Sequence, residues 1–172
     1  MRPVNHSNDK HWFALYTKPR CEFKARNQLN SINTDYYLPT IKKYHQWSDR
    51  KKEIEEPLIR GYIFIYADEH ERILSLEQPS IVRCVCERGH AACIPEWQIE
   101  NLRKVENVQG DLMIHNAIIP GKKVEIVNGP LRGAIGIMES MEHKNRFAVS
   151  IDILNRSVIV QLNKDTLVKV IP

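Results

Sequence analysis

A glycine-rich turn between short segments of alternating apolar residues constrains the fold of this chain more than any other feature. Apolar and polar residues alternate over 124–127, the turn carries Gly129 and Pro130, and Gly133 and Gly136 follow. Glycine adopts positive φ without strain and lets another backbone pass closely, and a small, strongly bent β-barrel needs both. The segment therefore predicts a hairpin in such a barrel.

The residues around this turn repeat the same β pattern. Gly, Asn and Asp separate the segments, as is typical of turns between short strands. Five strands are predicted, at residues 122–127, 134–140, 147–151, 158–162 and 167–170. So many short strands in so little chain favour a small all-β barrel over 119–172.

The first half of the chain has a different pattern, in which strands alternate with amphipathic helices. Strands are predicted at 12–16, 41–46, 53–57, 61–66 and 81–86, with a basic hairpin tip at 48–52. Helices are predicted at 19–31, capped by Thr17, at 68–76 and from 94–96 to 106. This order predicts an α+β domain over 11–107, after a disordered N-terminus at 1–10 and before a linker at 108–118.

Charge is unevenly distributed, although the net charge is only +4. Residues 18–52 contain nine Lys or Arg and three Asp or Glu, whereas residues 53–107 contain six and eleven. The basic block is a candidate surface for a phosphate backbone, and the acidic block for another partner. Ordinary solvated faces are the alternative for both.

The sequence offers no pattern for catalysis or for a cofactor. The seven histidines are scattered, and no nucleophile–base pair or pair of carboxylates has a catalytic spacing. Cys84 and Cys86, with His90 and Cys93, suggest a zinc site, but their spacing is not that of zinc modules. We expect these cysteines to pack in a short strand and loop, and we expect no enzyme activity, no cofactor and no metal.

No apolar run approaches membrane-spanning length, and the first ten residues do not look like a secretory signal. These features predict a cytoplasmic protein without membrane association. Nothing in the sequence indicates an oligomer, so we expect a monomer.

Taken together, the two halves resemble the NusG family of transcription elongation factors. The resemblance rests on residues 12–16, on residues 56–64 (Glu-Pro-Leu-Ile-Arg-Gly-Tyr-Ile-Phe) and on the turn at 124–136 with its continuation at 149–156. It implies an N-terminal NGN domain, whose sheet is packed with helices, followed by a small all-β KOW barrel.

The resemblance also implies how the chain works. An NGN domain presents an aromatic-lined pocket to the clamp coiled coil of RNA polymerase, and it suppresses pausing and termination. The positions that match this pocket are Tyr16, Ile59, Arg60, Tyr62 and Phe64. Because one face of every strand must be buried, packing in the core is the alternative for these rings.

Two further surfaces are implied. Basic residues near the first helix match positions beside the non-template DNA strand: Lys18, Arg20, Lys24 and Arg26. In the KOW barrel, one loop matches the contact with ribosomal protein or with the termination factor Rho: Ile153, Leu154, Asn155 and Arg156.

The chain departs from general members of the family at two places. It has Ile59-Arg60-Gly61-Tyr62 in place of aromatic-Pro-Gly-Tyr, and Leu154 in place of an aromatic residue. A His-Thr-Thr-like element that some specialised members carry is also absent, since residues 69–72 read Glu-His-Glu-Arg. With the short linker, the two departures favour an operon-specialised antiterminator of the RfaH type. A general NusG role that couples polymerase to Rho or the ribosome is the first alternative, and a KOW-type ribosome-associated RNA-binding protein is the second.

Overall fold

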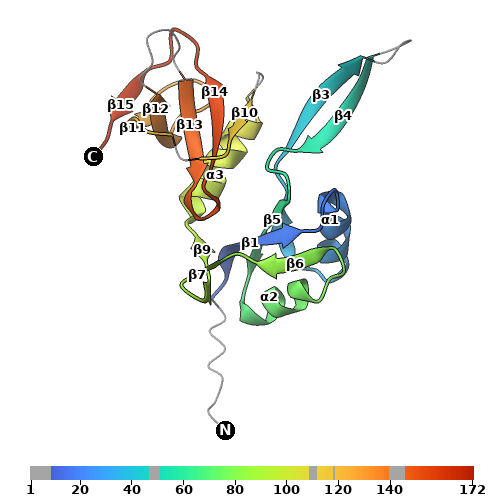
Figure 1. Cartoon of the computed structure of the whole chain (residues 1–172). Coiled ribbons are helices and arrows are strands. Elements are labelled where there is room, and N and C mark those ends of the chain that lie inside the picture. Colours follow the sequence, from blue (N-terminus) through green and yellow to red (C-terminus); the bar gives the residue numbers. More distant parts are fainter. Residues whose placement is uncertain (1–8, 47–50, 109–111, 118, 140–145) are drawn as a thin grey trace. The chain divides into compact units, whose positions relative to one another are not determined.

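The structure is a computed structural model that describes residues 9–46, 51–108, 112–117, 119–139 and 146–172. Most of the predicted disordered N-terminus, most of the hairpin tip at 48–52 and the turn at 143–145 lie outside the described residues. The chain divides into two compact units, and the boundary along the sequence lies between Ile94 and Pro95. Helices and strands are combined as the α+β prediction requires (Figure 1), which is thereby confirmed.

The N-terminal unit is built on an antiparallel sheet. In spatial order its strands are β2 (Asp35–Tyr37), β5 (Tyr62–Ala67), β1 (His11–Thr17) and β6 (Ile81–Cys84), and β9 (Cys93–Ile94) also pairs with β1. In the central pair, His11 lies opposite Ala67 and Tyr16 lies opposite Tyr62. Successive side chains of a strand point to opposite faces, so this register sorts the residues of β1 and β5 into two sets.

Two helices cover one face of this sheet, α1 (Glu22–Ser31) and α2 (Glu69–Leu76). Phe13 and Leu15 of β1 and Ile63 of β5 pack there against Ala25 and Leu29 of α1. All five side chains are at most 5% exposed, so this layer is the core of the unit.

The ends of the helices have different local causes. A capping box starts α2, because the Asp68 side chain accepts from the Glu71 backbone N–H (2.8 Å) and the Glu71 side chain accepts from the Asp68 N–H (3.0 Å). The prediction that Thr17 caps α1 is wrong: Thr17 is the last residue of β1, and α1 begins after Cys21, which makes no side-chain cap. A turn in which Arg20 has a φ of 59° separates the two elements.

The remaining strands of the N-terminal unit form two hairpins. The strands β3 (Thr40–Gln46) and β4 (Lys51–Pro57) make a long two-stranded ribbon (Figure 1), with Lys42 Nζ 2.7 Å from Glu53 Oε1. The strands β7 (Cys86–Glu87) and β8 (His90–Ala91) make a very short one. The single strand predicted at 81–86 is therefore two strands.

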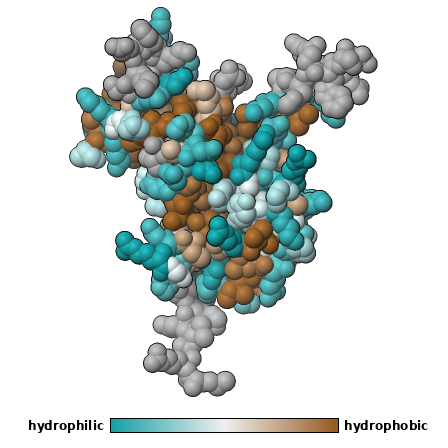
Figure 2. Space-filling view, in the orientation of Figure 1, coloured by the Kyte–Doolittle hydropathy of each residue, from teal (hydrophilic) through white to brown (hydrophobic). Residues whose placement is uncertain are grey.

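Some apolar side chains of the N-terminal unit remain exposed. Ile73 of α2 is 47% exposed and Val82 of β6 is 52% exposed. Figure 2 shows hydrophobic colour over the region of α2 and β6.

The C-terminal unit combines one helix, α3 (Glu96–Glu106), with an antiparallel sheet. In spatial order the strands are β10 (Met113–His115), β14 (Arg156–Gln161), β13 (Arg146–Ile151), β12 (Ile135–Glu139), β11 (Lys122–Ile126) and β15 (Val168–Val170). All five predicted strands of 122–170 are present within one or two residues. The strand β10 lies in the predicted linker, where no regular structure was expected.

The glycines of the turn adopt positive φ or allow a close backbone approach, as the sequence predicts. Gly129 and Gly133 have φ values of 75° and 74°. At Gly136, a Cβ atom would lie 2.4 Å from the carbonyl oxygen of Ala148 and 2.7 Å from the Phe147 ring. Only glycine fits where β12 passes this closely over β13.

Helix α3 packs against β12, β13 and β14 of this sheet. Ile99, Leu102 and Val105 supply its buried apolar face. The sequence analysis places this helix in the first domain, whereas its contacts group it with the C-terminal sheet. The predicted bounds of the NGN domain (11–107) and of the KOW domain (119–172) stay a prediction.

Candidate functional site

The face of the N-terminal sheet opposite α1 and α2 carries a row of aromatic rings. They come from three neighbouring strands and meet in pairs, with centroid distances of 5.3 Å for Trp12–Tyr66, 5.4 Å for Tyr16–Tyr62 and 6.1 Å for Tyr37–Phe64. Aromatic pairs across strands stabilise a sheet and also supply large, rigid contact area. This face is therefore the strongest candidate for a protein-binding site.

The Tyr16–Tyr62 pair lies at one end of the row, and both residues are half-buried. The two rings are nearly perpendicular, with an interplanar angle of 61°. The guanidinium carbon of Arg83 lies 5.8 Å from the centre of the Tyr16 ring, within cation–π distance. One side of the pair is thus fixed by packing, and part of each ring remains accessible.

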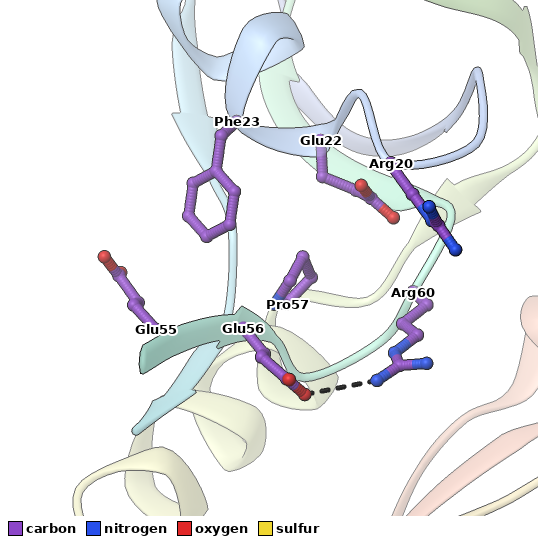
Figure 3. Close-up of a pocket in the computed structure, with 7 residues that line it drawn as sticks. All are labelled: Arg20, Glu22, Phe23, Glu55, Glu56, Pro57 and Arg60. Carbon is purple, nitrogen blue, oxygen red and sulfur yellow. Dashed lines mark hydrogen bonds and ion pairs between the residues drawn. The ribbon is translucent and has the colours of Figure 1, made fainter. Parts of the chain in front are cut away.

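The other predicted polymerase contacts lie in different environments. Ile59 and Phe64 are 1% and 0% exposed, as core residues are. Arg60 is exposed, and its guanidinium donates to Glu56 Oε2 at 3.1 Å; both residues line one pocket (Figure 3). The role of these three residues in binding stays a prediction.

The four predicted nucleic-acid residues come from α1 and from the turn before it. Lys18, Arg20 and Lys24 are exposed, and Arg26 is half-buried with its guanidinium 5.0 Å from the centre of the Phe23 ring. Exposed ammonium and guanidinium groups on one helix and its leading turn can follow a phosphate backbone. Their part in nucleic-acid binding stays a prediction.

The predicted partner loop of the C-terminal unit is a tight connection between β13 and β14. A short 3₁₀ turn (Asp152–Leu154) ends at Asn155, which has a φ of 49°. Leu154 is 6% exposed and packs inward, whereas Ile153 and Arg156 are half-buried and Asn155 is exposed.

Helix α3 is bound to this unit by two buried side-chain amides. Gln98 donates to Asp152 Oδ2 (2.8 Å) and accepts from the Asp152 backbone N–H (3.3 Å). Asn101 donates to the carbonyl of Ile135 and accepts from the Ile135 N–H (3.1 Å). Gln98 and Asn101 are 2% and 3% exposed, so the partner loop starts directly at a helix contact.

Sequence reasoning missed the residues that organise these surfaces. Glu22, Gln98 and Asn101 are buried polar residues within helices, where a sequence pattern reads them as solvent-facing. Tyr37 and Tyr66 were not assigned to the aromatic face, although Tyr66 has the same parity as Tyr62 in a predicted strand. Because alternate residues of a strand share one face, the spacing of Tyr66 from Tyr62 could have added Tyr66 to the predicted site.

The cysteines near the end of β6 lie in different environments. The single strand predicted at 81–86 would put Cys84 and Cys86 on one face. Instead β6 ends at Cys84, which is buried, and Cys86 is exposed in β7. Burial raises the pKa of the Cys84 thiol. Among the described residues, no group of three or more His, Cys, Asp or Glu is placed to hold a metal ion.

None of the helices within the described ranges is long and apolar enough to cross a membrane.

Comparison with protein families gives the chain an identity. The family model described as "Transcription termination factor nusG" matches residues 10–103, which is more than half of the chain. The chain belongs to the NusG family. It is thus a transcription factor of that family, and the aromatic face and α1 both lie within the matched residues. A sequence comparison with curated proteins finds no match.

This NusG-family chain matches several solved structures. A structure described as "Domain interaction in Thermotoga maritima NusG" matches with a TM-score of 0.51 and 16% identity, over 90% of this chain and 93% of that one. Conformations A and B of an MjSpt4:Spt5 complex match with TM-scores of 0.31 and 18% identity. They cover 93% and 90% of this chain, and 97% and 99% of the matched chains.

Proposed function

We propose that this NusG-family protein is a transcription elongation factor that binds RNA polymerase through the Tyr16–Tyr62 end of the aromatic face of its N-terminal sheet and suppresses pausing and termination. The half-buried Tyr16–Tyr62 pair carries the proposal. Two rings held 5.4 Å apart on adjacent strands give a preformed apolar surface with little rotamer entropy to lose. The tip of the polymerase clamp coiled coil is the proposed partner.

The basic residues of α1 support a second contact, with the non-template DNA strand. Lys18 and Lys24 are exposed, and they precede or lie within the helix that packs beneath the same sheet. Polymerase binding through the sheet and phosphate binding through α1 would therefore use one rigid unit, which supplies the geometry that simultaneous contacts need. This contact adds affinity without demanding a particular DNA sequence.

The experiment is a binding measurement of Tyr62→Ala to RNA polymerase, with Tyr66→Ala as the matched control. Tyr66 is on the same strand and face but pairs with Trp12 at the other end of the row. A central aromatic residue of an interface contributes about 2 kcal/mol or more, so Tyr62→Ala should weaken binding by about thirtyfold, and the control by much less. A folded Tyr62→Ala variant that binds as well as the wild type would refute the proposal.

We also propose that the protein serves a limited set of operons, as RfaH-type antiterminators do. Arg60 and Leu154 support this, because a charged residue and an aliphatic residue stand where general members have other types. Leu154 points into the C-terminal unit, which leaves the exposed Asn155 and the half-buried Ile153 and Arg156 as the accessible part of the loop offered to ribosomal protein or Rho.

A genome-wide crosslinking map of the protein beside that of RNA polymerase tests the specialised role. Signal restricted to one or a few long operons is expected. Signal on essentially every transcribed gene would instead establish a general NusG role, and a signal that follows ribosomes rather than polymerase would favour the RNA-binding alternative.

A further inference from the structure

Gly61 connects β1, α1 and β5 through both of its backbone polar groups. Its carbonyl accepts from the Thr17 N–H at the end of β1 (2.9 Å), and its N–H donates to Glu22 Oε1 at the start of α1 (2.8 Å). Glu22 is only 6% exposed. Charged acceptors form the stronger class of hydrogen bond, so this contact holds the turn more firmly than a neutral side chain would.

The position of Gly61 in turn determines where Tyr16 and Tyr62 lie. Gly61 has a φ of 83°, and a Cβ atom there would be 3.2 Å from Cε2 of Tyr16, so the Tyr16 ring packs directly against it. Tyr62 is the next residue, and its ring meets Tyr16 from the adjacent strand. A displacement of Gly61 would therefore move one ring and remove the support of the other.

We propose that Glu22 is a positioning residue, whose carboxylate holds the Arg60–Tyr62 turn and thereby fixes the Tyr16–Tyr62 pair for its partner. The inference rests on the proposed function, because it assigns a purpose to the geometry of that pair. Glu22 suits the task because it is the first residue of α1, where the free backbone N–H groups of the helix stabilise a negative charge.

The surroundings of Glu22 make it distinct from its acidic neighbours. Figure 3 shows its carboxylate beside Arg20, in a pocket that Glu55, Glu56 and Arg60 also line. Glu56 is bonded to Arg60 on the rim, and Glu55 is exposed. Of the three carboxylates that line this pocket, Glu22 is the one bonded to Gly61.

The test compares Glu22→Ala, Glu22→Asp and Glu22→Gln in the full chain, with Glu55→Ala as the control. Alanine removes the carboxylate that accepts from the Gly61 N–H. Aspartate keeps a carboxylate but is one methylene shorter, and glutamine keeps an acceptor oxygen on a side chain of the same length. Two quantities are measured: hydrogen exchange at the Gly61 amide, with the amides of Ile63 and Ile65 as a check of folding, and the affinity for RNA polymerase.

For Glu22→Ala and Glu22→Asp, exchange at Gly61 should accelerate about tenfold or more, and affinity should fall severalfold, since one charge-assisted hydrogen bond is lost. Glu22→Gln, which keeps an acceptor oxygen but loses the charge, should restore both in part, and Glu55→Ala should change neither. If Glu22→Ala does not fold, Glu22→Asp decides in its place.

Three results would overturn the inference. In the first, Gly61 exchange is unchanged in the alanine and aspartate variants. In the second, exchange accelerates but affinity stays at the wild-type value while Tyr62→Ala still weakens binding, which leaves the proposed function intact. In the third, Tyr62→Ala does not weaken binding either, so the proposed function fails together with this role of Glu22.

Discussion

Asn101 gives the sharpest test of how the C-terminal unit is held together. Its side-chain amide exchanges two hydrogen bonds with the backbone of Ile135, at the end of β12 where the pairing with β13 has not yet begun. The amide thus takes the place of a neighbouring strand, and it ties α3 to the sheet. Asn101→Ala removes both bonds and leaves Ile135 without these partners.

The loss of stability expected for Asn101→Ala follows from these two hydrogen bonds. A net contribution of about 0.5–1.5 kcal/mol per hydrogen bond gives about 2 kcal/mol for the pair. For a unit of this size each kcal/mol lowers the melting temperature by about 4–8 °C, so the transition of the C-terminal unit should move down by about 8–16 °C.

Thermal unfolding of the full chain, followed by methyl NMR signals, would measure this shift. Ala148 reports on the C-terminal sheet, and Ala25 reports on the N-terminal core. Asn107→Ala is the matched control, because Asn107 is exposed and its amide donates only to Arg103 within the same helix. If Asn101→Ala moves the Ala148 transition no further than the control does, α3 is not bound to the sheet in the way described. A shift at Ala148 without one at Ala25 is expected.

Three further results are expected. Gly136→Ala should destabilise the C-terminal unit in urea by about 1–3 kcal/mol or more, because the new methyl group would overlap the Ala148 carbonyl; unfolding at wild-type urea concentrations would contradict this. Lys18→Ala with Lys24→Ala should reduce the slope of log affinity against log salt for elongation complexes by about 1.4, and an unaltered slope would remove both lysines from the DNA surface. The Arg72 hydrogen bond lowers the pKa of Glu69, so its stabilisation is complete above the ordinary carboxyl pKa and is lost as the pH falls through the lowered value. Glu69→Gln should therefore flatten the acid limb of a stability–pH curve, by less than about 1 kcal/mol because the Glu69 side chain is half exposed to solvent, and a curve parallel to the wild type would show that the pair contributes nothing.

The parts of this fold that sequence could predict are those with a short, local cause. The continuous apolar run over 62–67 and the glycines at 129, 133 and 136 specify a strand and turns by themselves, and the structure has them. The start of α2 was recoverable for the same reason, since its capping box spans four consecutive residues.

The parts that could not be predicted depend on partners far away in the chain. The bond from Gly61 to Glu22 spans 39 positions, and those of Gln98 to Asp152 span 54. A glutamate or an amide on a helix has no local feature that distinguishes such a buried acceptor from a solvated one. The strand β10 is similar, because its three residues have no periodicity and pair with β14 across more than forty residues.

The pairing of β10 with β14 also decides which strand edge of the C-terminal sheet is covered. An open strand edge presents unpaired N–H and C=O groups to any other chain, and natural sheets protect such edges. Here Met113, Ile114 and His115 occupy part of that edge, although all three side chains are exposed. The three residues of β10 thus cover this part of the β14 edge, and their deletion would leave its N–H and C=O groups open to pairing with a strand of another molecule.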